Sequence, residues 1–247
     1  MNIALLADIH SNLEALTACL EHAAAHGAES YAFIGDLVGY GADPVAVLDR
    51  LQTEVARGAV AVQGNHDAAV AGQGSEAMND TAEAAIAWTR AQLNEAQRGF
   101  LANLPLSVRD DKLLFVHASA DAPEKWIYVH DALCAAHSMA ATDARFIFSG
   151  HVHEPMLYYI GAGGRPLPFQ PMPGTSIPVG PHRKWLAIVG SCGQPRDGNT
   201  AACYAMIDTT RWLLTFFRVP YDYAAAAAKI RAAGLPERLA LRLEQGE

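Results

Sequence analysis

The sequence NIALLADIHSNLEALTACLEHAAAHGAESYAFIGD, residues 2–36, contains two apolar runs with a helical pattern between them. The runs at 2–7 and 31–35 are short and almost entirely apolar, which predicts buried β-strands. Between them, leucines recur at helical spacing over residues 13–26, and Gly27 is a stop signal. A strand, a helix and a second strand in succession predict a right-handed crossover between parallel strands, and therefore an α/β fold.

The rest of the chain extends this pattern and then changes it. Asp43-Pro44 is typical of a helix start, a third apolar run follows at 59–63, and residues 79–104 have a helical pattern. Beyond them, a series of short apolar runs separated by turns predicts mixed or antiparallel sheet, and two helices are expected near 222–245. Two sheets packed together, with helices outside, would bury this number of strands.

The composition narrows the class of protein. The chain has 247 residues, of which 51% are hydrophobic and 18% charged, with a formal net charge of −8. This acidity argues against a nucleic-acid groove, so any bound anion must be attracted by a local positive centre. No apolar run approaches the roughly 20 residues that span a bilayer, and no membrane association is expected. The four cysteines lack metal-type spacing and are interpreted as reduced thiols of a cytoplasmic protein.

Acidic, amide and imidazole side chains follow the predicted strands at their carboxyl ends, where α/β sheets bind ligands. Each has an ordinary structural explanation, because an aspartate can cap a helix, an asparagine can form a turn and a histidine can be hydrogen-bonded in a core. Five separate segments that bring such groups to one crevice favour a metal site instead. The segments contribute Asp8 and His10; Asp36; Asn65, His66 and Asp67; His117; and His151 and His153.

The series D-x-H, GD, GNHD, H and GHVH, which spans residues 8–153, resembles the calcineurin-like metallophosphoesterase superfamily in order and approximate spacing. The resemblance implies a four-layer αββα sandwich of two mixed β-sheets flanked by helices. We expect residues 1–247 to form a single domain of this kind, with the C-terminal helices packed on it. The resemblance also implies two metal ions bridged by Asp36 and a catalytic role for His66 over the substrate. One ion would take Asp8, His10, Asp36 and His153, and the other Asp36, Asn65, His117 and His151.

The implied ligands explain the implied chemistry. Mixed nitrogen and oxygen ligands suit Mn, Fe or Zn rather than Mg²⁺ or Ca²⁺. Two such ions acidify a shared water to a bridging hydroxide and bind the phosphoryl oxygens of an ester. Two divalent ions, two aspartates and one hydroxide leave a net charge of about plus one, which supplies the local positive centre.

The resemblance leaves the reaction open at a finer level. We favour hydrolysis of a small phosphodiester or phosphomonoester, with a nucleotide as one candidate. The alternatives are a phosphoprotein phosphatase or dinucleoside polyphosphate hydrolase of the same superfamily, and a non-catalytic binding module on this fold. Against the first alternative, GDLVGYG at 35–41 lacks the arginine of the GD-x-V-D-R-G pattern, and GNHD replaces GNHE.

Three residues are candidates for substrate contact, each with a competing structural role. Asn12 could contact phosphate or cap the helix that follows it. Trp126, in an aromatic loop that also contains Tyr128, could stack on a nucleobase or anchor the loop to the core. Arg196 could hold a phosphate oxygen or pair with an acid such as Asp197.

Overall fold

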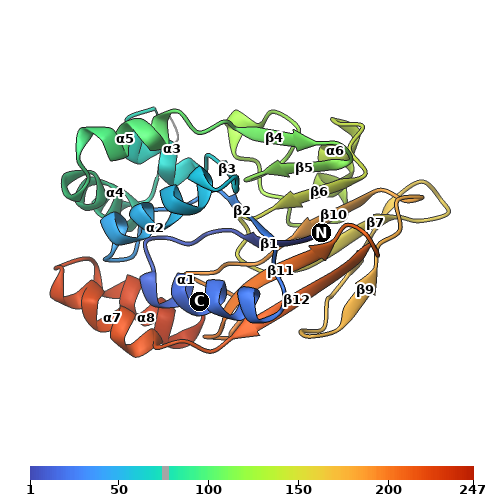
Figure 1. Ribbon diagram of the computed structural model, residues 1–247. Coiled ribbons are helices and arrows are strands. Elements are labelled where there is room, and N and C mark those ends of the chain that lie inside the picture. The colour runs from blue at the N-terminus through green and yellow to red at the C-terminus, as the bar shows by residue number, and fades with distance from the viewer. Residues whose placement is uncertain (74–77) are drawn as a thin grey trace.

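Two mixed β-sheets of six strands each form the centre of the molecule (Figure 1). The computed structural model describes residues 1–73 and 78–247. The first sheet has the strand order β3-β2-β1-β11-β12-β9, in which only the β1–β2 and β2–β3 pairs are parallel. Its strands are β1 (Asn2–Leu6), β2 (Ser30–Ile34), β3 (Val60–Val62), β9 (Ser176–Pro178), β11 (Ala202–Asp208) and β12 (Leu213–Val219).

The second sheet has the strand order β4-β5-β6-β10-β7-β8. Here β5, β6 and β10 are parallel neighbours, and the remaining pairs are antiparallel. Its strands are β4 (Ser107–Asp110), β5 (Leu113–Val116), β6 (Phe146–Ser149), β7 (Met156–Ile160), β8 (Pro166–Phe169) and β10 (Trp185–Ile188).

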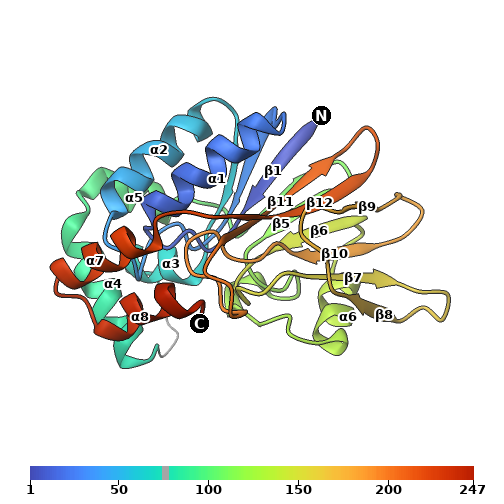
Figure 2. The ribbon, with the colours of Figure 1, turned by 90° about the horizontal axis from the view of Figure 1, so that it is seen from below.

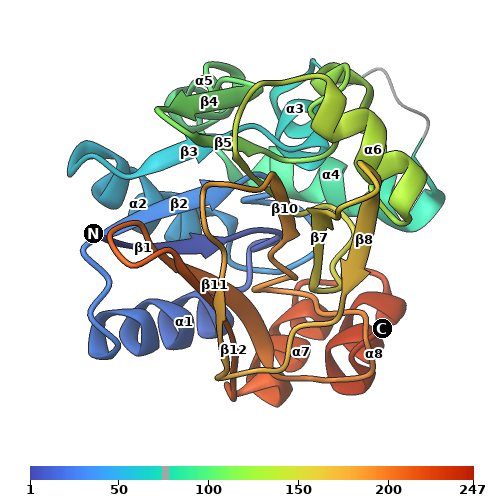
Figure 3. The same ribbon diagram turned by 90° about the vertical axis from the view of Figure 1, so that its right-hand side faces the viewer.

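The helices lie outside the two sheets. In Figure 3, α1 and α2 are on the side of the first sheet and α6 is on the side of the second. The helices are α1 (Leu13–Ala25), α2 (Pro44–Ala56), α3 (Asn65–Ala71), α4 (Asp80–Gln92), α5 (Glu95–Ala102), α6 (Ala132–Ala140), α7 (Tyr223–Ala232) and α8 (Glu237–Gln245), with a 3₁₀ turn at Pro123–Lys125.

Apolar side chains fill the space between the layers. Leu5 and Ile34 of the first sheet pack with Phe115 and Phe148 of the second, and all four are buried. Further clusters join the first sheet to α1 and α2, and the second sheet to α6. Burying each such side chain stabilises the fold by about 1.5–3 kcal/mol, so the two-sheet centre is strongly favoured.

Helices from distant parts of the chain meet at one end of the sheets. Figure 2 shows α3, α4, α7 and α8 together at that end. Tyr40, in the loop after β2, belongs to the same buried cluster as side chains of α4, α7 and α8. Lys229 of α7 also forms ion pairs with Glu14 of α1 and with Asp43 before α2. The C-terminal helices are therefore fixed beside the loop that follows β2.

The predicted fold class is confirmed, and the differences are local. The helix expected over 79–104 is two helices, because Asn94 and Gln97 form a capping box that begins a new one. Helix α6 and strands β4 and β9 were not expected from the sequence. Among the described residues, no helix combines the length and apolar character that a bilayer span requires.

Candidate metal centre

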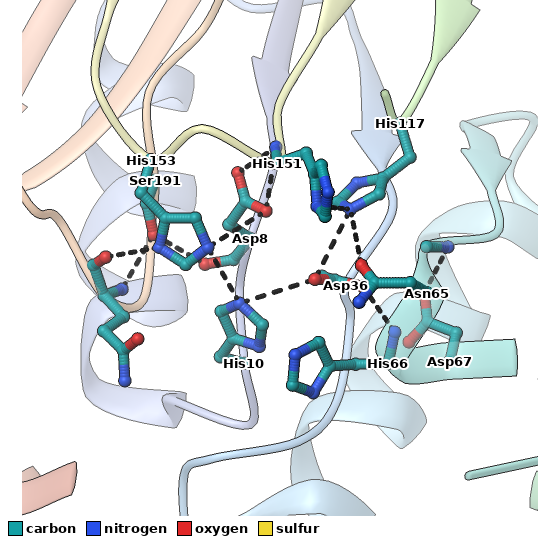
Figure 4. Close-up of polar contacts among 12 residues, drawn as sticks. Asp8, His10, Asp36, Asn65, His66, Asp67, His117, His151, His153 and Ser191 are labelled. Atoms are coloured by element: carbon teal, nitrogen blue, oxygen red, sulfur yellow. Dashed lines mark hydrogen bonds and ion pairs between the residues drawn. The ribbon is translucent and has the colours of Figure 1, made fainter. Parts of the chain in front are cut away.

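The residues singled out in the sequence meet at the carboxyl ends of the central strands (Figure 4). Asp8 and His10 follow β1, and Asp36 follows β2. Asn65 is the first residue of α3, and His117 follows β5. His151 and His153 lie in the loop after β6. Every member is at most 8% exposed: Asp8, His10, Asp36, Asn65, His66, His117, His151 and His153.

The backbone at these positions is held in an unfavourable conformation. Five of the seven predicted ligands have a positive φ of 48–68°, in the left-handed region that favours glycine. Such a residue costs on the order of 1–3 kcal/mol and persists only where the surrounding structure imposes it, which is typical of functional sites. The five are Asp8, His10, Asp36, His151 and His153.

Two glycines of the sequence motifs are required by close approach to these ligands. A Cβ atom at Gly64 would lie 2.2 Å from Oδ1 of Asp36, and one at Gly150 would lie 2.6 Å from Oδ2 of Asp8. Neither glycine could therefore carry a side chain without moving a carboxylate. The glycine of GNHD therefore allows the loop after β3 to come close to Asp36, and the glycine of GHVH allows the loop after β6 to come close to Asp8.

One group of ligand atoms surrounds the first proposed ion position. Nε2 of His10 lies 3.2 Å from Nε2 of His153 and 3.6 Å from Oδ2 of Asp36, and Nε2 of His153 lies 3.5 Å from Oδ1 of Asp8. Two atoms bound to one ion at about 2.0–2.2 Å lie roughly 3.0–3.5 Å apart. The spacing of this group therefore fits a transition-metal ion.

A second group has its centre at His117. Its Nε2 lies 3.1 Å from Nδ1 of His151, 3.3 Å from Oδ1 of Asn65 and 3.4 Å from Oδ2 of Asp36. Oδ2 of Asp36 is thus shared between His10 and His117, as the dashed lines in Figure 4 show. One carboxylate oxygen joins the two groups, which is the arrangement expected of a bridging ligand.

Backbone carbonyls fix the orientation of three imidazoles. Nδ1 of His10, His117 and His153 lies 3.3, 2.9 and 2.6 Å from the carbonyl oxygens of Val38, Ile34 and Gln194. When each Nδ1–H donates to its carbonyl, Nε2 carries a lone pair directed at the centre. In His151, by contrast, Nδ1 faces the cluster, and its buried Nε2 has no hydrogen-bond partner among the described residues.

The comparisons with known proteins agree with this geometry. The calcineurin-like phosphoesterase superfamily domain matches residues 1–211, which contain every proposed ligand. The chain belongs to the calcineurin-like phosphoesterase superfamily. An uncharacterized protein of Methanocaldococcus jannaschii is 34% identical over 99% of this chain and 98% of its own length. A metallophosphoesterase of Sphaerobacter thermophilus is 34% identical and superposes with a TM-score of 0.87 over 100% of this chain and 99% of its own. A hypothetical protein of Pyrococcus horikoshii shares the fold at 21% identity, with a TM-score of 0.78 over 100% and 98% of the two chains.

Burial and neighbouring charges shift the pKa values of the titratable groups in this candidate metal centre. Burial raises the pKa of Asp8 from 3.8 to about 8. Burial alone would lower the pKa of His117, but the adjacent Asp36 carboxylate raises it to about 9. Burial would raise the pKa of Asp36, but His117 and His66 hold it well below its usual value. Burial lowers the pKa of His151 to about 3, so its imidazole is neutral and available as a ligand.

The backbone of His66 is hydrogen-bonded to Asp36, the proposed bridging residue. Its N–H donates to Oδ1 of Asp36 at 2.9 Å, while its ring lies beside the rings of Tyr40 and His10, with centroids 4.3 and 4.9 Å away. Nδ1 of this ring is buried and has no hydrogen-bond partner among the described residues. A ligand atom of His66 also lies within 4.8 Å of those of His10 and Asp36, so coordination by His66 is a competing role that needs an experiment.

Asp67 holds the loops of the site together. Its Oδ1 accepts hydrogen bonds from the backbone N–H groups of Leu37 and Val38, and its Oδ2 accepts one from Gly64. This fully buried carboxylate therefore connects the loop after β2 to the start of α3. In the described part of the chain its hydrogen-bond partners are these backbone groups, and no histidine ring is among them.

Asn12 and Trp126 have the structural contacts that competed with substrate binding. Oδ1 of Asn12 accepts the N–H of Ala15 as the N-cap of α1, and its Nδ2 donates to Gly193 and Tyr221. Trp126 is 7% exposed and packs with Ala68 and Ala118. The polar atoms of Asn12 are engaged by these contacts and Trp126 is buried, so both residues fill the structural roles that compete with substrate contact.

Arg196 does not form the ion pair with Asp197 that competed with substrate contact. The alternative partner Asp197 forms its ion pair with Arg218 instead. Nη2 of Arg196 donates to Oε1 of Gln194, and its Nε is buried without a partner among the described residues. Its guanidinium carbon lies 6.0 Å from the centre of the Tyr40 ring.

Several contacts of the site could not be found from the motifs. Tyr128 stacks on His151, the carbonyl of Gln194 orients His153, and Arg242 of α8 lies over Tyr40. Tyr40 and Tyr128 are aromatic residues close to a motif, which is a weak signal. Gln194 acts through its backbone, and no sequence signal points to it.

Proposed function

We propose that this protein is a metal-dependent phosphoesterase that hydrolyses a small phosphomonoester or phosphodiester. The superfamily uses divalent metal ions, and the donor set described above fits a pair of them. Ions held there would acidify a water molecule and neutralise phosphoryl oxygens, which is the chemistry that ester hydrolysis needs at neutral pH.

The observation that carries this proposal is the position of Asp36. Its Oδ2 lies 3.6 Å from Nε2 of His10 and 3.4 Å from Nε2 of His117. A carboxylate that only caps a helix, or only accepts a hydrogen bond in the core, does not require two imidazoles from different segments beside it. Among the groups whose ligand atoms lie within 4.8 Å of one another, Asp36 belongs to both His10–Asp36–His66 and Asp36–His117–His151.

The chain's own residues would hold the site in shape and contact the substrate. Asp36 holds the two halves of the site at a fixed separation, and the carbonyl-bound histidines keep their orientation. His66 is placed to donate a hydrogen bond to a phosphoryl oxygen or a proton to the leaving oxygen. Burial lowers its pKa, and an anionic substrate beside it would raise that pKa again. We assign Mn, Fe or Zn to the site from the ligand types.

A small substrate is favoured over a phosphoprotein. The loop after β2 contains Tyr40, 6% exposed, where the phosphoprotein phosphatase pattern has an arginine. The ring of Tyr40 fills the space beside His10 and His66.

Hydrolysis of two chromogenic esters tests the proposal. The protein is loaded with Mn²⁺, its metal content is measured, and turnover of p-nitrophenyl phosphate and bis-p-nitrophenyl phosphate is compared with that of an Asp36→Asn variant. Turnover above the variant supports the phosphoesterase, and the preferred ester separates monoesterase from diesterase. Bound metal without turnover of either ester would favour the non-catalytic binding module.

A further inference from the structure

Two arginines lie over one tyrosine at the edge of the metal centre. The guanidinium carbons of Arg196 and Arg242 are 6.0 and 5.8 Å from the centre of the Tyr40 ring. The same ring lies 4.3 Å from His66 and 4.6 Å from His10, measured between centroids. One aromatic ring therefore lies near two guanidinium groups and near the two histidines beside the place where the phosphoryl group would react.

Neither arginine is neutralised by a carboxylate in the described residues, 1–73 and 78–247. Arg196 donates to the amide oxygen of Gln194 and has a buried Nε without a partner. Other arginines of this acidic chain do form ion pairs: Arg218 with Asp197, and Arg231 with Glu237 and Glu244. Arg196 and Arg242 therefore have no ion-pair partner among the described residues, beside the candidate centre of a chain whose formal net charge is −8.

The two charges also act on each other and on the site. Burial, and then the neighbouring charge of Arg196, lower the pKa of Arg242. Like charges repel each other, and an anion bound by both guanidinium groups would relieve that repulsion. Guanidinium groups match phosphate oxygens in shape, with two parallel hydrogen bonds.

We propose that Arg196 and Arg242 form a second phosphate subsite, and that the substrate is a small phosphoester that carries a second phosphate. This inference rests on the proposed function, because the metal centre is taken to hold the phosphate that reacts. Arg242 is a specificity residue on α8, beyond residue 211, where the match to the superfamily domain ends.

Glucose 1,6-bisphosphate and glucose 1-phosphate are probes that differ in one phosphate. For the Mn²⁺-loaded full chain, kcat/KM should be about 10–100-fold higher for the bisphosphate, the range expected for charge-assisted hydrogen bonds. Arg242→Gln should remove most of this preference. Arg238→Gln is the matched control, because Arg238 is an exposed arginine on the same helix, and it should retain the preference.

The outcomes separate this subsite from the proposed function. Equal kcat/KM for the two sugars, or equal losses in Arg238→Gln and Arg242→Gln, would overturn the subsite even where p-nitrophenyl phosphate is hydrolysed. If no ester is hydrolysed, the proposed function fails. Calorimetric titration of the two sugar phosphates then tests the subsite alone, with tighter binding of the bisphosphate expected and its loss in Arg242→Gln.

Discussion

The ring of Tyr128 lies flat against the imidazole of His151, with centroids 3.8 Å apart and planes inclined by 24°. His151 contributes Nδ1 to the second group of ligand atoms, and its other nitrogen has no hydrogen-bond partner among the described residues. The stack therefore holds the imidazole of His151 on one face, whereas carbonyl contacts at Nδ1 orient the imidazoles of His10, His117 and His153.

This contact predicts that Tyr128→Ala weakens binding of the second ion by about 10-fold, the lower end of the effect of removing an orienting group. Tyr128→Phe keeps the ring and should bind metal as the unmodified protein does. Titration of both variants with Mn²⁺ measures the difference. Equal affinity of the alanine and phenylalanine variants would show that the stack does not orient His151.

The division of the ligands into two groups predicts unequal losses. Asn65→Ala or His151→Ala should weaken the second ion more than the first, because both side chains contact His117. His153→Ala should weaken the first, because its Nε2 faces His10 and Asp8. Metal content per chain, measured by mass spectrometry at rising metal concentration, reports the two sites. A loss of both ions in every variant would contradict the division.

His66 is predicted to act on substrate rather than on metal. His66→Ala should therefore lower kcat by about 10²–10⁴-fold, the range for a general acid or base, at unchanged metal content. Metal analysis and steady-state kinetics on the same sample are required. Loss of an ion from this variant would instead make His66 a ligand.

Metal binding should release protons and strengthen with pH. In the metal-free protein, burial raises the pKa of Asp8 to about 8, and Asp36 offsets burial at His117 to raise its pKa to about 9. At pH 7 both groups are protonated, whereas a metal needs the carboxylate and the neutral imidazole. Affinity should rise from pH 6 to 9, with release of up to about two protons at pH 7. Calorimetry in buffers of different ionisation enthalpy counts them, and a pH-independent affinity would contradict the prediction.

The carboxylate of Asp67 is predicted to stabilise the site loops. In Asp67→Asn, one amide nitrogen would face the backbone N–H of Leu37 and Val38 or that of Gly64, and at least one buried donor would lose its acceptor. The free energy of unfolding should fall by about 1–3 kcal/mol, measured by urea denaturation. Asp143→Asn removes the exposed ion pair with Arg109 and should leave the free energy of unfolding almost unchanged, because solvent screens that pair. Similar losses in the two variants would mean that Asp67 has no special role.

The sequence predicted most elements but erred where a capping signal competes with helical periodicity. The pattern over 79–104 continues through Leu93, yet the side chain of Asn94 caps a new helix there. Strands β4 and β9 are short and largely exposed, so they lack the apolar run that predicts a strand. The sequence left the role of Trp126 open between substrate and core, because an aromatic loop residue has the same sequence signal in both cases, and the structure shows it packed with Ala68 and Ala118.

By itself, the sequence determined which side chains could form the metal centre. Each motif places its ligands within a few residues of a strand end, and parallel strands bring those ends to one edge. The tertiary structure alone decided what surrounds the ligands: the ring of Tyr128 on His151, the carbonyl of Gln194 at His153 and the charge of Arg242 from α8. These contacts join segments far apart in the chain through packing and backbone groups, which have no local sequence pattern.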